Sequence, residues 1–164
     1  NEIISKITAE FLNSNSSNID KTVMNALKII CKETSYNRAT INKSDDDGKI
    51  KYLYKWAENA DDVLMKGELP MQDYKIQDFK WTYNQIIEKG YAYSGDIKRQ
   101  AKNMLEMQLL NKINVKSYYI TTMLSRKNAV KYLILSSYND IEIDDSDKAF
   151  LKTFSQILST ALEK

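Results

Sequence analysis

Few residues in this chain of 164 could carry catalytic chemistry. Histidine is absent, which removes the commonest general base and the commonest metal ligand. The single cysteine, Cys31, falls on the apolar stripe of a predicted helix, where a thiol behaves as a small hydrophobic side chain. A reactive cysteine needs exposure and a nearby positive charge, so core packing is the favoured interpretation. With no phosphate-binding glycine motif either, we predict a protein that is not an enzyme and carries no cofactor.

The candidate cation sites are two acidic stretches, "KSDDDGK" and "DIEIDDSD". Aligned as an EF-hand loop, Asp45, Asp47 and Gly48 fit the third, fifth and sixth positions. Lys43 and Tyr54 then occupy the first and twelfth positions, where carboxylates are required, so a hairpin turn is favoured. The second stretch suits the negatively charged first turn of a helix. No metal site is predicted.

A polar strand is the most informative feature. The stretch "NKINVKSYYITTML" (111–124) begins like the end of a helix and finishes as about ten residues of strand. It holds a serine, two tyrosines and two threonines, whereas a strand built only for packing would be Val, Ile and Leu. Hydroxyl groups in a strand that looks buried indicate one wall of a small-molecule cavity.

Charge and hydropathy exclude two classes of partner. The formal net charge is +2, and the 21 lysines are scattered along the chain beside only 3 arginines. Nucleic-acid surfaces cluster their basic residues and favour arginine, so no nucleic-acid partner is expected. No apolar run approaches the ~20 residues of a membrane span. The lone cysteine suggests a reducing compartment, so we predict a cytoplasmic location without direct membrane contact.

The helices expected at the two ends are set by three- and four-residue spacing of apolar side chains. The terminal helices are predicted over 1–16 and 145–164, with acids at Asp144, Asp145 and Asp147 suiting the start of the last one. A second helix begins near Asn18 or Asp20 and passes through Cys31. Because the chain starts without Met, we expect it to be part of a longer protein.

Between these helices the spacing changes to that of strands. Residues 36–43 and 49–56 form a predicted hairpin, in whose second strand Ile50, Tyr52, Tyr54 and Trp56 face one way. A short helix capped by Asp78 follows, with Phe79, Tyr83, Ile86 and Ile87 inward and Gly90 at its end. Another helix spans about 98–112, and the strand of 111–124 pairs with 129–138 through a turn at 125–128. Two hairpins imply an antiparallel sheet, with helices over both faces.

Five stretches carry a family resemblance through their order and spacing. They are "NIDKTVMNALKIICKETSYNRATI", "LYKW", "KWTYNQIIEKGYAYSGDI", "LLNKINVKSYYITTML" and "DDSDKAFLKTFSQILSTAL". In this order they resemble a GAF domain, a sensory module of bacterial signalling proteins and cyclic-nucleotide phosphodiesterases. The resemblance runs from about Ile7 to Leu162. It implies one α+β domain over 1–164, related to PAS folds, with terminal helices on one sheet face and short helices and loops roofing a pocket on the other.

The resemblance also implies which residues face the pocket. Photoreceptor members of the family attach a bilin through a cysteine followed by histidine, and this pair is absent. The implied ligand-binding residues come from four strands and the roof: Arg38, Thr40, Asn42, Trp56, Phe79, Trp81, Met104, Tyr118, Ile120, Thr122, Leu133, Leu135 and Ser137. A strand register shifted by one residue would invert the facing of every strand residue among them.

Two functions remain open. The first is sensing of an unidentified small molecule, with control of a covalently attached histidine kinase, diguanylate cyclase or transcriptional activator. The alternative is a ligand-free GAF module for dimerisation and signal relay. A cavity of roughly 300 Å³ or more would favour sensing, whereas a filled core would favour relay. In either case the resemblance implies a homodimer through the terminal helices, which would continue into flanking signalling segments.

Overall fold

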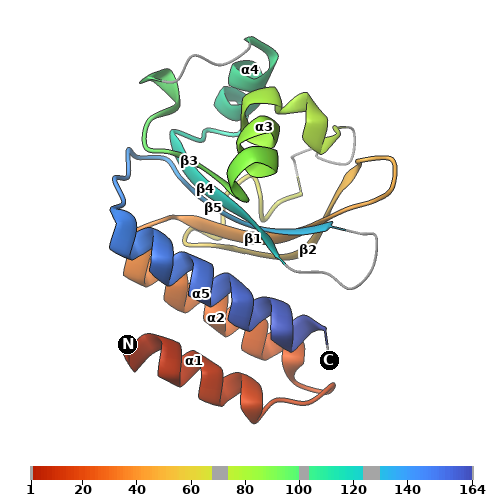
Figure 1. Cartoon of the computed structure of the whole chain (residues 1–164), viewed down its shortest axis with the longest axis vertical. Helices are drawn as coiled ribbons and strands as arrows, with labels where there is room; N and C mark the ends of the chain where they lie inside the picture. The colour runs from red at the N-terminus through yellow and green to blue at the C-terminus, as the bar shows by residue number, and fades with distance from the viewer. Residues whose placement is uncertain (1, 68–73, 100–103, 124–129, 164) are drawn as a thin grey trace.

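The computed structural model describes residues 2–67, 74–99, 104–123 and 130–163 (Figure 1). Its helices there are α1 Glu2–Leu12, α2 Ile19–Thr34, α3 Lys80–Lys89, α4 Met104–Lys112 and α5 Asp145–Leu162. The strands are β1 Arg38–Ser44, β2 Ile50–Ala57, β3 Tyr91–Ser94, β4 Ser117–Met123 and β5 Val130–Ser137. Two 3₁₀ turns, η2 Ile76–Asp78 and η3 Ile97–Arg99, precede α3 and α4. None of the described helices is long and apolar enough to cross a membrane.

The strands form one antiparallel sheet in the order β2-β1-β5-β4-β3. The two strands of each predicted hairpin are therefore hydrogen-bonded neighbours in the sheet. The turn expected at 125–128 lies outside the described residues. Strand β3 was not predicted. Its four residues, "YAYS", are too few to show a clear alternation, so pairing with β4 rather than local sequence makes it a strand.

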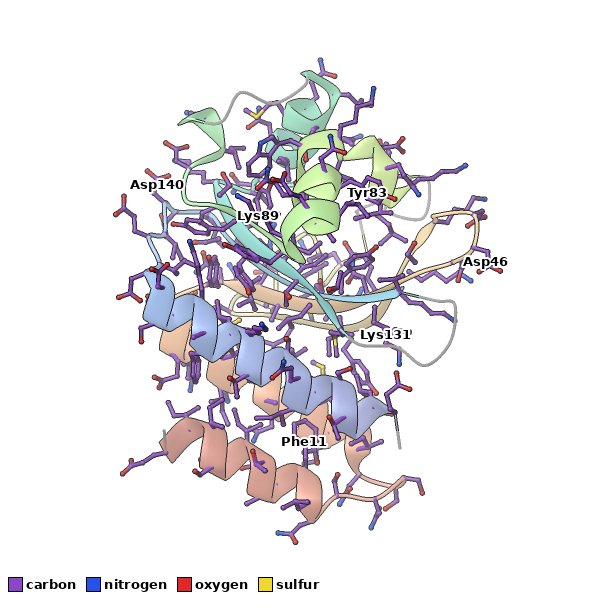
Figure 2. All side chains as sticks on the ribbon, in the orientation of Figure 1. Phe11, Asp46, Tyr83, Lys89, Lys131 and Asp140 are labelled. Atoms are coloured by element: carbon purple, nitrogen blue, oxygen red, sulfur yellow. The ribbon has the colours of Figure 1, made fainter. Side chains whose placement is uncertain are left out.

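Helices cover the two faces of the sheet in different ways (Figure 1). Helices α2 and α5 both pack against one face, and α1 packs on both of them from the far side. Phe11 fills the space between α1 and this pair (Figure 2). Helices α3 and α4 lie over the opposite face. The α+β architecture expected from the sequence is confirmed.

The face under α2 and α5 is a closed apolar core, which we call the closed face. Its fully buried side chains include Leu27, Ile30, Ile41, Leu133 and Leu135. The predicted start of α5 is confirmed in detail: Asp144 accepts a hydrogen bond from the Asp147 backbone, and Asp147 accepts one from the Asp144 backbone. This reciprocal cap fixes where α5 begins.

Some expected boundaries are wrong. The first helix ends at Leu12, before the predicted position 16, and the helix expected over 98–112 is instead η3 followed by α4. Asp78 does not cap α3, because it ends η2 and accepts a hydrogen bond from the Lys75 backbone. Ile87 was expected inward but is 69% exposed.

A β-bulge changes the facing of β2 halfway along it. Ile41 pairs with Tyr54 and Asn42 with Tyr52, so Leu53 is an extra residue opposite β1. Before the bulge, Ile50 and Tyr52 face the side of the sheet covered by α3 and α4. After it, Tyr54 and Trp56 pack against the closed face. The uniform alternation predicted for this strand is therefore wrong after Leu53.

Candidate ligand-binding cavity

A cavity of about 100 Å³ lies between the sheet and the layer formed by α3, α4 and the loop after β2. We call this side of the sheet the cavity face. The lining residues are Arg38, Thr40, Asn42, Ile50, Tyr52, Leu64, Ile76, Phe79, Thr82, Leu110, Ile113, Val115, Tyr118, Ile120, Ile134 and Ser136. Most of this wall is apolar, with a few polar groups set into it.

Six of the predicted ligand-binding residues line this cavity. They are Arg38, Thr40, Asn42, Phe79, Tyr118 and Ile120. Three come from alternate positions of β1 and two from alternate positions of β4, so the predicted facing of both strands is correct. Whether they bind a ligand stays a prediction.

The predicted facing of β5 is wrong by one residue. Leu133 and Leu135 are fully buried in the closed face, and Ile134 and Ser136 line the cavity in their place. Ser137 instead donates a hydrogen bond to Asn37 Oδ1 at 2.8 Å. The run "YLILSS" is apolar or small at both parities, so nothing in it shows which set faces which layer.

Four other predicted residues are not placed in the cavity wall. Trp56 lies beyond the bulge on the closed face, and Trp81 is half-buried among the apolar side chains of the roof. Thr122 lies past the end of the cavity, where its hydroxyl donates to the Gly90 carbonyl at 3.3 Å. The side chain of Met104 lies outside the described residues.

At one end of the cavity is a buried ion pair. Arg38 Nε donates to Asp62 Oδ2 at 2.7 Å, and both side chains are at most 5% exposed. The same guanidinium donates to the Ile113 carbonyl at 2.7 Å and lies 4.7 Å from the centre of the Tyr138 ring. Arg38 therefore joins the sheet to the loop after β2 and to the end of α4. Burial raises the pKa of the neighbouring Tyr52 to about 12, although Arg38 opposes the shift.

Two strands away from Arg38, in the same row across the sheet, a hydrogen-bonded chain links the roof to β4. Helix α3 lacks a side-chain cap of its own, and the fully buried Glu106 of α4 takes that role. Its carboxylate accepts from the backbone N–H groups of Trp81 and Thr82 at 3.1 and 3.2 Å. It also accepts from the Thr82 hydroxyl at 2.6 Å.

Tyr118 extends this chain onto the sheet. Its hydroxyl lies 2.6 Å from that of Thr82, and because the Thr82 proton is given to Glu106, Tyr118 is the donor to Thr82. Burial raises the pKa of Tyr118 above its ordinary range, the Thr82 hydrogen bond lowers it and Glu106 raises it further. The phenol is therefore neutral at the cavity wall.

One wall residue has an unmet hydrogen-bonding need. Asn42 is 1% exposed, and its Oδ1 has no hydrogen-bond partner among the described residues. Tyr36 and Ser94 also hold buried oxygens of this kind, but neither lines the cavity. A buried polar atom without a partner costs about 1–3 kcal/mol, so the position calls for an explanation.

Sequence reasoning missed Asp62, Thr82 and Glu106. Asp62 stands in a loop among other acids, and Glu106 has the spacing of an ordinary helix surface residue. Only the folded arrangement brings them to the cavity. No group of three or more acidic or cysteine side chains that could hold a metal ion occurs within the described ranges.

Solved structures identify the architecture. A phycocyanobilin-bound GAF domain from a cyanobacterial phytochrome matches with a TM-score of 0.76 at 11% identity, covering 99% of this chain and 92% of that one. The chain has a GAF fold. A domain of a protein described as a two-component sensor histidine kinase from Sinorhizobium meliloti also matches the chain. Its TM-score is 0.64 at 9% identity, and the match covers 91% of this chain and 92% of that one.

An enzyme shares the architecture. Free methionine-R-sulfoxide reductase from Neisseria meningitidis, in complex with its substrate, matches with a TM-score of 0.66 at 10% identity, covering 99% of this chain and 87% of that one. No family model matches the sequence, and no curated protein matches it significantly. At these identities the likeness concerns the GAF fold alone. In this chain Cys31 is buried, and burial, with a smaller contribution from Glu58, raises its pKa to about 12.

Proposed function

We propose that this GAF fold is a sensory domain that binds a small molecule in the cavity and controls an output domain of the same cytoplasmic protein. The observation that carries the proposal is a cavity whose wall includes a buried Asn42 oxygen with no hydrogen-bond partner among the described residues. A region built only for packing would fill the space and pair that oxygen. The likeness to a domain of a sensor histidine kinase supports a signalling role, with a kinase, diguanylate cyclase or transcriptional activator as output.

The proposed ligand differs from those in the similar structures. Phycocyanobilin is a tetrapyrrole and far larger than a cavity of about 100 Å³. Likeness to the reductase supports no activity here, because the chain has one cysteine and its thiol is buried and neutral. We therefore propose a non-enzymatic role with a smaller ligand.

The sheet offers a direct route from cavity to terminal helices. On β5, Ile134 lines the cavity while the next residue, Leu135, packs under α2 and α5. On β1, Thr40 and Ile41 are related in the same way. Occupation of the cavity that shifts these strands would reach the helices through close-packed side chains.

A ligand-free relay module is the second candidate. The cavity volume favours it, since about 100 Å³ is a third of the roughly 300 Å³ at which ligand pockets usually begin. In that case the protein's own side chains would close the space in solution, and signals would pass through the helices alone.

Xenon binding separates these functions without knowledge of the ligand, because xenon occupies accessible, largely apolar cavities. We expect xenon between Phe79, Ile120 and Ile134 in a pressurised crystal of the protein. The matched control is Ile134→Phe, which should fill the space and exclude the gas. Absence of xenon from the native protein would favour relay and contradict the sensing proposal.

We also propose a parallel homodimer through α1 and α5. Leu12 on α1 is 71% exposed, and Ile157 and Leu162 of α5 are only partly covered within one chain. A four-helix contact would bury these side chains across a two-fold axis. Sedimentation at micromolar concentration should give a dimer, and Leu12→Glu should weaken it; a monomer for the native chain would contradict the contact.

A further inference from the structure

Charge around the cavity is already balanced within the protein. Arg38 is the one charged residue among the described lining residues, and Asp62 neutralises it at 2.7 Å. Glu106, behind the wall, is held by two backbone N–H groups at the start of α3 and by the Thr82 hydroxyl. An ionic ligand would lose its hydration and meet no unpaired opposite charge, which is unfavourable in a buried site.

The Asn42 side-chain oxygen in the cavity wall indicates a ligand that donates a hydrogen bond. Asn42 Oδ1 accepts nothing from the described residues, and Asn42 sits beside the β-bulge between Tyr52 and Tyr132 of the adjacent strands. The amide torsion of asparagine is broad, so a small rotation can aim this oxygen at a guest. A ligand with an N–H or O–H group would satisfy it.

The volume of the cavity limits the size of the ligand. A cavity of about 150 Å³ accommodates benzene, which has six heavy atoms. The present volume of about 100 Å³ therefore suits about four or five. The surfaces of Phe79, Ile120 and Ile134 would cover the apolar part of such a molecule.

We propose that the cavity takes a neutral molecule of about four or five heavy atoms, which donates one hydrogen bond to Asn42 Oδ1 and places its apolar part against Phe79, Ile120 and Ile134. The proposal rests on the sensing function above and specifies its ligand class. It excludes carboxylates and phosphates as occupants of this cavity.

Two matched pairs of probes test donor and charge separately. Pyrrole and furan are planar five-membered rings of similar size, of which only pyrrole donates a hydrogen bond. Propionamide and propionate have the same heavy-atom count, and only propionate is charged. Titrations followed by NMR should show pyrrole binding about 3- to 10-fold more tightly than furan, the usual net worth of one neutral hydrogen bond. Propionamide should bind, and propionate should not.

Substitutions locate the effect. Asn42→Leu should reduce the ratio of the pyrrole affinity to the furan affinity to about one. The control Thr122→Val removes a hydroxyl on the same sheet face but outside the cavity and should leave the ratio unchanged. The ratio in the native protein remains decisive even if Asn42→Leu folds poorly.

The outcomes distinguish this proposal from the sensing function. Furan binding as tightly as pyrrole, or propionate binding as tightly as propionamide, would overturn the ligand class. Entry of xenon without binding of any of the four probes would also overturn it while leaving a sensory cavity in place. Failure of both xenon and the probes would overturn the sensing function itself.

Discussion

The closed face and the cavity face of one sheet bury their side chains by different means. Under α2 and α5 the sheet presents Ile41, Leu133 and Leu135, which are fully buried and need no polar partner. Toward α3 and α4 the same strands present Arg38 and Asn42, which need partners far away in the sequence. The centre of the first face is filled, and a groove of about 410 Å³ lies at its edge between β4 and α5. The second face retains about 100 Å³ between the sheet and its roof.

Under the proposed sensing function, this difference separates stability from binding within one domain. Close packing of apolar side chains gives the closed face most of its favourable burial energy. The cavity face keeps polar groups whose desolvation must be offset by specific pairing, and at Asn42 it is not offset. Such an imbalance is common where a site is built for a ligand.

The largest effect is expected from breaking the buried ion pair of the cavity face. Asp62→Ala should lower the free energy of unfolding by about 3–5 kcal/mol, because Arg38 would remain buried without its counter-charge. The control is the exposed neighbour, Asp61→Ala, which should change it by less than about 0.5 kcal/mol. Urea denaturation measures both. Equal small effects would mean that solvent reaches Arg38.

Adjacent residues of β5 compare the two faces directly. Leu135→Ala should cost about 2–5 kcal/mol, since it opens a hole in a filled core. Ile134→Ala should cost only about 1–2 kcal/mol, because this half-buried side chain already borders a cavity. Denaturation of both variants under one set of conditions provides the test. A larger loss at Ile134 would contradict the assignment of the faces.

Two asparagines give the smallest and most specific contrast. Asn42→Leu should raise the free energy of unfolding by about 1–2 kcal/mol, because it removes a buried oxygen that has no partner in the part of the chain that the structure describes. Asn37→Leu should lower it by about 1–3 kcal/mol, because Asn37 bonds Glu58, Ser137 and the Tyr138 backbone. Thermal unfolding without ligand measures both. Destabilisation by Asn42→Leu would show that its oxygen is satisfied in solution.

The sequence predicted those parts of the fold that local pattern determines. Helical spacing located α2 and α5, and the acids at Asp144 and Asp147 marked the start of α5 correctly. The strand "SYYITTM" has no polar and apolar alternation, and the resemblance to a GAF domain placed Tyr118 and Ile120 on the cavity face. Without that resemblance a shift of one residue would have inverted their facing.

Other parts depended on tertiary structure. Nothing in "KIKYLYKW" marks the bulge at Leu53, which moves Trp56 to the closed face. The continuous apolar run in β5 left its facing undetermined, so Leu135 was assigned to the wrong face. Asp62 and Glu106 reach the cavity through loops and helix packing, which no short sequence pattern records.

The central claim is that the cavity between the sheet and helices α3 and α4 admits a small neutral guest, and methyl NMR during a pyrrole titration tests it most directly. The account predicts shifts of the Ile120 and Ile134 methyl signals, with those of Leu133 and Leu135 on the opposite face unchanged. No shift in any of them, or shifts centred on the two leucines, would contradict it.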